Sequence, residues 1–342
     1  MRGCRHLLVA PLIAVAPLRA QWTYVATSTT SELRGLSMVD RRVVWATGAG
    51  GTVLRSMDGG RTWTHLAVPD AAALDFRSVQ TLGGGSALVA SAGEAEKGLA
   101  RIFATADGGR HWHVAWSTDQ KGVFLDALAF WDARTGVALS DPVGGTFVLM
   151  RTTDGGKTWS RIPPDRLPRT LPGEAAFAAS GSILVAGNSN DMWIGTGGGV
   201  ARVMRSGDRG ATWSFTDAPV YAAAAAAGIF SLAFLDEARG IAVGGDYTQP
   251  RLAAPSVALT LDGGRSWHRA ASPPAAYLSG VAWTGTDRHA IAVGLAGTFV
   301  TRDGGETWSQ TDTVALNAVR CTRGTCVAVG PRGRIARMDD LR

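Results

Sequence analysis

The chain has 342 residues, of which 46% are hydrophobic, 18% are charged and 44 are glycine. This length can bury a sizeable core, and the many short apolar runs broken by glycine favour an all-β structure without long helices. The formal net charge is +6, but only +3 remains if the segment containing Arg2, Arg5 and Arg19 is removed, leaving 31 basic and 28 acidic residues. Such a weak positive charge argues against nucleic acid as the partner.

The first 20 residues have the pattern of an export signal. MRGCRH is a positively charged start, LLVAPLIAVAP is an apolar centre, and the small residue Ala20 precedes Gln21. The apolar run is too short to span a membrane, and no other stretch approaches ~20 apolar residues. We therefore expect a signal peptide over residues 1–20 and a mature chain of one domain over 21–342, located in the periplasm or secreted.

One short phrase occurs six times in the remainder of the chain, as in TTDGGKTW at 152–159. Its aspartates follow one another at intervals of 41 to 54 residues, which is about one four-stranded propeller blade per copy. Each copy predicts a hairpin turn in which the Asp accepts backbone hydrogen bonds, the glycines adopt positive φ angles and the Trp opens the next strand. The six predicted structural aspartates are Asp58, Asp107, Asp154, Asp208, Asp262 and Asp303.

The two ends of the chain together predict a seventh blade. Residues 316–340 supply three further strand-like runs and a degenerate turn at Asp339-Asp340, but no following Trp. QWTYVAT at 21–27 resembles a strand that follows a repeat, so Trp22 takes the place that Trp63 has in the first repeat. The N-terminal strand is thus expected to complete the C-terminal blade and close a seven-bladed propeller without free sheet edges.

Propeller topology predicts where a binding site lies. If the strands A to D of each blade run outward from the channel, the six turns lie on one face, and the D–A and B–C loops lie on the opposite face. Aligning the starts of the A strands predicts one residue per blade near the channel mouth, namely Arg34, Arg77, Asp126, Glu174, Phe230, Ser279 and Asn317. The segments 140–145, 187–199 and 244–250, read as B–C loops, add Asp141, Trp193, Asp246 and Tyr247 to this face.

Each of these carboxylates also has a structural interpretation. Asp141 and Asp246 stand beside Pro or Gly and are typical of turn residues. Asp126 and Glu174 are alternatively carboxylates that pair with backbone groups or an arginine of a neighbouring blade.

The remaining motifs predict stabilisation of the fold. Cys321 and Cys326 flank TRGT and are expected to close a hairpin disulfide in an oxidising compartment, a redox site being the alternative. GTGGG at 195–199 precedes a β run, so it lacks the context of a dinucleotide site, and the histidines are scattered. We expect no cofactor and no metal site.

The repeated phrase resembles the Asp-box, or BNR, repeat of sialidases, sortilin-type receptors, some glucanases and the photosystem II stability/assembly factor family. Residues 124–159, 173–181, 195–213 and 228–247 resemble internal blades of the bacterial relatives of that last family. The resemblance implies an exported seven-bladed scaffold or assembly factor with a protein client. Members of the family are thought to engage their client through a basic patch, for which Arg34 and Arg77 are the candidates here.

The sequence leaves two functional hypotheses. The first is a non-catalytic, monomeric, exported propeller that binds a protein or peptide on the D–A/B–C face, across blades 3 to 5. The alternative is a carbohydrate-binding or glycoside hydrolase propeller that uses Asp126 and Glu174 as its two carboxylates. A sialidase is disfavoured, because its Arg-Ile-Pro segment belongs near the start of the first blade and here it occurs at 161–163.

Overall fold

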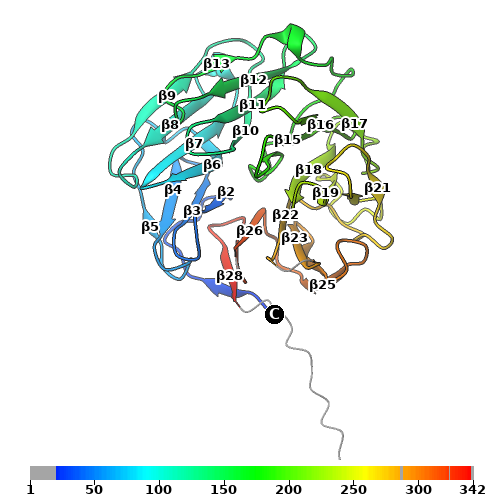
Figure 1. Ribbon diagram of the computed structural model, residues 1–342. Helices are drawn as coiled ribbons and strands as arrows, with labels where there is room; N and C mark the ends of the chain where they lie inside the picture. Colours follow the sequence, from blue (N-terminus) through cyan, green and yellow to red (C-terminus); the bar gives the residue numbers. More distant parts are fainter. Residues whose placement is uncertain (1–20, 286–287, 323, 340–342) are drawn as a thin grey trace, which may run out of the picture.

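Seven four-stranded antiparallel sheets form a ring in the computed structural model of the protein (Figure 1). The structure describes residues 21–285, 288–322 and 324–339, so the predicted signal peptide lies outside the described residues. Apart from the strands, the described residues contain two short 3-10 turns, η1 (Ala95–Lys97) and η2 (Pro164–Arg166). The predicted all-β, seven-bladed propeller is therefore confirmed.

The strands of each blade follow in order from the channel outward. Blades 1 and 2 consist of β2 (Leu33–Met38), β3 (Val44–Gly48), β4 (Thr52–Ser56), β5 (Thr64–His65), and of β6 (Asp75–Gly83), β7 (Ser86–Ala92), β8 (Arg101–Thr105), β9 (His113–Ser117). Blades 3 and 4 consist of β10 (Leu125–Phe130), β11 (Gly136–Pro142), β12 (Phe147–Thr152), β13 (Ser160–Arg161), and of β14 (Leu184–Ala186), β15 (Met192–Gly195), β16 (Arg202–Ser206), β17 (Ser214–Asp217). Blades 5 and 6 consist of β18 (Ala227–Phe234), β19 (Gly240–Asp246), β20 (Val257–Thr260), β21 (His268–Arg269), and of β22 (Gly280–Trp283), β23 (Ala290–Gly294), β24 (Gly297–Thr301), β25 (Ser309–Asp312). Blade 7 consists of β26 (Ala318–Thr322), β27 (Thr325–Val329), β28 (Ile335–Asp339) and β1 (Thr23–Val25).

Blade 7 combines the two ends of the chain, as predicted. Thr23 of β1 pairs with Arg337 of β28, and Figure 1 shows the blue N-terminal strand beside the red β28. Trp22 is 5% exposed, and its Nε1 donates to Thr298 Oγ1 of blade 6 at 2.9 Å. In the first repeat, Trp63 instead donates to Gly60 of its own turn, so Trp22 has the equivalent place but links two blades.

In blades 1 to 6, the Asp-box turns close the C–D hairpin through a recurring set of hydrogen bonds, shown here for blade 3. Asp154 Oδ1 accepts from the backbone N–H groups of Lys157 and Thr158, both at 3.0 Å, and Oδ2 accepts from Thr158 Oγ1 at 2.6 Å. Trp159 Nε1 donates to Gly156 O at 3.0 Å. In the second copy, the His111 ring replaces the hydroxyl that contacts the aspartate. Because only the ionised Asp accepts all these bonds, they hold the pKa of Asp154 well below its usual value.

The core lies between neighbouring blades. Leu88 and Ile102 of blade 2 pack with Leu128 and Val148 of blade 3, and the box Trp159 packs against this cluster. Such contacts between flat sheets make every blade depend on both neighbours, because a single four-stranded blade cannot bury both of its faces alone.

The predicted hairpin cysteines are paired. Cys321 of β26 lies opposite Cys326 of β27, with Cα atoms 4.0 Å apart, and the two sulfurs are bonded. The disulfide closes the hairpin between the innermost strand of blade 7 and its neighbour.

Candidate functional site

The channel contains a cavity of about 480 Å³ at the face where the innermost strands begin, opposite the Asp-box turns. We call it the upper cavity. Among the residues that line it are Arg34, Arg77, Asp126, Asp141, Phe230, Tyr247, Tyr277 and Asn317. Five of the eight residues predicted to bind, namely Arg34, Arg77, Asp126, Asp141 and Tyr247, are thus brought to one cavity.

Irregularities in the innermost strands present several of these side chains to the channel. The pairing register shifts at Arg34 in β2, at Arg77 in β6, at Asp126 in β10 and at Phe230 in β18. An extra residue in one strand is left unpaired and changes the direction of its side chain. The same local irregularity in four blades therefore places two cations, one carboxyl and one aromatic ring around a shared space.

A segment between η2 and β14 crosses the channel below this cavity. We call residues 175–182 the plug segment. The carbonyl oxygens of Ala178 and Ala179 accept from Arg77 Nη1 and Arg34 Nη1, both at 3.4 Å. Gly181 has a φ of +66°, and a Cβ there would lie 3.0 Å from Arg77 O, so a larger residue would be strained and would crowd blade 2. The plug segment lies between the upper cavity and a second cavity in the lower half of the channel.

Hydroxyl groups fix the end of the plug segment against blade 5. Ser180 Oγ contacts Ser182 Oγ at 2.6 Å, and Ser182 Oγ contacts Ser231 Oγ at 2.7 Å. Ser231 Oγ in turn accepts from the backbone N–H of Val281 at 3.1 Å. All three serines are buried, so this chain satisfies polar groups that would otherwise be costly inside the ring.

Each arginine of the upper cavity is held by an acid two residues before it. Arg34 Nη2 contacts Glu32 Oε1 at 2.7 Å, and Arg77 Nε contacts Asp75 Oδ2 at 2.7 Å. Both side chains are partly exposed, and Arg34 Nε and Arg77 Nη2 donate to no described residue. Each guanidinium therefore keeps a donor for an outside acceptor.

Asp126 is a buried carboxyl whose two oxygens have no hydrogen-bond partner among the described residues. Burial, and then the charge of Asp141, raise its pKa well above the usual value, while Arg77 acts in the opposite direction. Burial also raises the pKa of Asp141, whose Oδ1 accepts from Ala176 N at 2.9 Å. Among the described residues, Asp126 thus lacks the hydrogen-bonded partner that its structural interpretation predicts.

Aromatic rings form the opposite wall of the upper cavity. Phe177 stacks on Phe230 with ring centroids 4.1 Å apart, and Tyr277 meets Phe230 edge to face at 4.8 Å. Tyr247 covers the same cluster and remains 48% exposed. The sequence prediction missed Phe177 and Tyr277, although each is an aromatic residue among small residues in a D–A segment.

Glu174 does not line the upper cavity. The sequence placed it at the start of an innermost strand, but β14 begins only at Leu184, after the plug segment. Its side chain is fully buried and forms an ion pair with Arg202, whose Nε donates to Oε1 at 3.0 Å. Thr196 Oγ1 and the Leu171 N–H also donate to it. The structural interpretation is therefore correct for Glu174, and it does not form a two-carboxylate site with Asp126.

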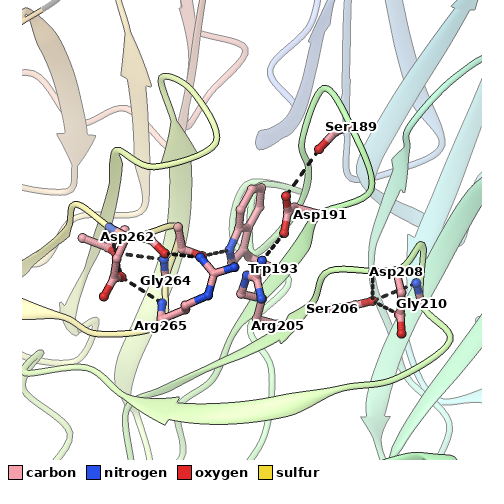
Figure 2. A network of polar contacts seen from close by, with 12 residues as sticks. Ser189, Asp191, Trp193, Arg205, Ser206, Asp208, Gly210, Asp262, Gly264 and Arg265 are labelled. Carbon is pink, nitrogen blue, oxygen red and sulfur yellow. Dashed lines mark hydrogen bonds and ion pairs between the residues drawn. The ribbon is translucent and has the colours of Figure 1, made fainter.

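Trp193 lies elsewhere as well. The sequence assigned 187–199 to one B–C loop, but Trp193 belongs to β15, and residues 187–191 form the A–B turn on the Asp-box side. Figure 2 shows its ring beside the Asp-box turn of blade 5, where Nε1 donates to Gly263 O at 2.8 Å. The ring is fully buried and stacks on Phe234. Trp193 thus joins blades 4 and 5 and is not exposed for binding.

Asp246 has the role of a turn residue. Its Oδ1 accepts from the N–H of Thr248 at 2.8 Å and from Thr248 Oγ1 at 2.6 Å. The side-chain bond from Thr248 is the main cause of its lowered pKa. Asp246 therefore stabilises the loop that carries Tyr247 to the cavity rim.

Within the described ranges no helix is long and apolar enough to cross a membrane, and no group of three or more His, Cys, Asp or Glu residues is arranged to hold a metal ion.

The comparisons with known proteins agree with this architecture. The BNR/Asp-box repeat family matches residues 150–161 and 299–310, two of the six turns. A structure described as YCF48 bound to D1 peptide aligns with a TM-score of 0.67 at 18% identity, over 93% of this chain and 96% of that one. YCF48 from Cyanidioschyzon merolae aligns with a TM-score of 0.66 at 16% identity, over 94% of this chain and 99% of that one.

The chain is a seven-bladed propeller with BNR/Asp-box repeats, and its fold is similar to that of the solved YCF48 structures. At this level of identity the likeness to the solved YCF48 structures concerns the fold. The GH74 enzyme of Niastella koreensis aligns with a TM-score of 0.48 at 12% identity, over 88% of this chain and 62% of that one. No curated protein sequence matches the chain. The comparisons thus concern the fold, and the candidate site is described by the residues of this chain alone.

Proposed function

We propose that this YCF48-like propeller is an exported, non-catalytic scaffold that binds a protein or peptide segment in the upper cavity. The observation that carries the proposal is the combination of Arg34 and Arg77, an unpartnered Asp126 and an aromatic wall around one 480 Å³ space. Cavities that are mostly apolar with a few convergent polar groups are typical of binding sites.

The three sets of groups suit different parts of a peptide. The remaining guanidinium donors of Arg34 and Arg77 suit a carboxylate, which arginine binds through charge-assisted hydrogen bonds. The rings of Phe230 and Tyr247 suit an apolar or aromatic side chain. Asp126, whose pKa is raised by burial, suits a polar group of the peptide backbone.

The comparisons support a peptide as the ligand. One of the two YCF48 structures with this fold is described as bound to D1 peptide. The proposal of a glycoside hydrolase with Asp126 and Glu174 loses support, because Glu174 is fully buried in its ion pair with Arg202.

Export is part of the proposal and is supported by two features. Residues 1–20 have the pattern of a signal peptide, and the Cys321–Cys326 disulfide suits an oxidising compartment. N-terminal sequencing of the protein recovered from a periplasmic or culture fraction tests this, and Gln21 is the expected first residue. Recovery from the cytoplasm with Met1 intact would contradict export.

A displayed peptide library tests binding directly. Peptides enriched on the purified protein are synthesised, and their affinity is measured by fluorescence anisotropy. Arg34→Ala/Arg77→Ala is expected to weaken binding about tenfold or more, because two charge-assisted contacts are lost. Arg110→Ala/Arg302→Ala is the matched control, since it removes two exposed arginines from the Asp-box turns.

Two results would contradict the peptide-binding proposal. One is that no peptide is enriched. The other is that the control variant and the cavity variant weaken binding equally, which would indicate a general charge effect. Cleavage of a polysaccharide by the purified protein, lost in Asp126→Asn, would instead favour an enzyme.

A further inference from the structure

The lower half of the channel contains a second cavity, of about 360 Å³, on the Asp-box side of the plug segment. We call it the lower cavity. It is lined by the second halves of the innermost strands of all seven blades, and its residues are distinct from those of the upper cavity. None of its lining residues takes part in the contacts on which the proposed function rests.

Strand register defines a ring of seven equivalent side chains in the lower cavity. Each lies opposite a matching position of the second strand of its blade, as Arg320 does opposite Val327 and Ala282 opposite Ile291. The members of this inner ring, in blade order, are Ser37, Gln80, Ala129, Val185, Ala233, Ala282 and Arg320. Four of the seven are small and apolar, which leaves room at the centre, and one is a cation.

Arg320 has no acid partner. Its Nη1 donates to Val319 O at 3.1 Å, and no described carboxylate forms an ion pair with it. The arginines of the upper cavity differ, because each has its own Glu or Asp. Burial lowers the pKa of Arg320 to about 10, so the side chain is still charged at neutral pH. The side chain is only partly exposed to solvent, and a cation in such a place without a counter-ion favours the binding of an anion.

The neighbours of Arg320 restrict the chemistry of that anion. Gln80 lines the same cavity, and its side-chain amide forms no hydrogen bond with a described residue, so this amide supplies a second donor. Ser37 Oγ is already bonded to Thr81 Oγ1 at 2.8 Å. The remaining wall includes Leu128, Phe130 and Trp283, which suit a hydrocarbon body.

We propose that the lower cavity binds a small organic monocarboxylate, with its carboxylate on Arg320 and Gln80 and its apolar body in the inner ring. The planar guanidinium matches the geometry of a carboxylate, and a single cation matches a single negative charge. A volume of about 360 Å³ lies at the lower end of small-molecule sites, which excludes long chains.

Isothermal titration calorimetry of the purified chain with hexanoate tests this proposal. We expect saturable binding at one site, little heat with hexan-1-ol, and an affinity reduced about tenfold or more in Arg320→Gln, because the charge-assisted contact is lost. Arg110→Gln is the matched control, and hexanoate is expected to bind it as it binds the parent protein. If Arg320→Gln does not fold, as judged by circular dichroism, Ala233→Val retains the charge, narrows the inner ring and is expected to weaken binding.

Three results would overturn the proposal. The first is no saturable binding of hexanoate. The second is unchanged affinity in both Arg320→Gln and Ala233→Val. The third is loss of binding in Arg77→Gln but not in Arg320→Gln, which would place the carboxylate in the upper cavity. Because the peptide assay reports on Arg34 and Arg77 alone, either proposal can fail while the other stands.

Discussion

Asp126 lies beside Asp141 at the edge of blade 3, and the charge of Asp141 adds to the effect of burial in raising the pKa of Asp126. Both residues line the upper cavity, Asp126 from the irregular start of β10 and Asp141 from the end of the neighbouring strand β11. The two carboxyls that the fold brings together are therefore Asp126 and Asp141. The sequence had suggested Asp126 and Glu174.

The stability of the protein is expected to depend on pH through Asp126. Because its pKa is higher in the folded than in the unfolded state, the folded protein binds more protons between the two values, and stability falls as pH rises from about 4 toward the folded-state value. In Asp126→Asn the side chain at this position does not titrate, so this fall in stability with rising pH is absent. The variant should therefore gain stability relative to the parent protein as pH rises from 4 to 8, with almost no difference near pH 4. Urea unfolding at several pH values measures this, and a difference independent of pH would contradict it.

The Asp-box carboxylates are expected to stabilise the blades. Asp154→Ala removes the acceptor of two backbone N–H groups and of the Thr158 hydroxyl, which should cost about 1–3 kcal/mol of unfolding free energy. Asp165→Ala, at an exposed position in the following 3-10 turn, should change it by less than about 0.5 kcal/mol. Equal effects in chemical denaturation would show that the box geometry does not matter for stability.

Closure of the ring is expected to depend on Trp22. Trp22→Ala should cost about 3–5 kcal/mol, the usual effect of removing a large buried ring. Thr298→Val removes only the acceptor of its Nε1 and should cost about 1 kcal/mol. The denaturation midpoints of the two variants and of the parent protein measure these costs. A small effect of Trp22→Ala would mean that the N-terminal strand contributes little to closure of the ring.

The plug segment is expected to require Gly181. Gly181→Ala adds a Cβ 3.0 Å from Arg77 O at a φ of +66°, whereas Gly50→Ala has a similar φ of +67° and meets nothing within 4 Å. Gly50→Ala should cost about 1 kcal/mol for the backbone conformation, and Gly181→Ala should cost clearly more. The difference between the two unfolding free energies isolates the close approach to blade 2. If they agree, the plug segment can move away from blade 2 at little cost.

The disulfide is expected to make a modest contribution. It closes a loop with a sequence separation of five, for which chain entropy gives about 2 kcal/mol. Cys321→Ser/Cys326→Ser should lower the unfolding free energy by this amount and make it insensitive to dithiothreitol. The parent protein, unfolded with and without dithiothreitol, is the internal comparison. Identical unfolding curves of the parent protein in the two conditions would contradict the prediction.

The sequence predicted those features that depend on local chemistry or on the repeat. The turn around Asp154 is encoded within eight residues, and regular blade spacing aligned Arg34, Arg77 and Asp126 correctly. Blade 4 departs from that regularity, because the plug segment precedes β14 and its small residues resemble the start of a strand. Glu174 was misplaced for this reason. Trp193 was misplaced because short β15 lies among glycine, asparagine and serine residues that are typical of a loop.

The pairing of Thr23 with Arg337 also sets an order of events during synthesis. The partner of β1 is β28, the strand that lies furthest from it along the described chain, so blade 7 is the last sheet of the ring that can form. Until then blade 6 and blade 1 each present an uncovered face to the surroundings, and the chain has to bring together two segments with nearly its whole length between them. The ring therefore closes only after β28 has become available to pair with β1.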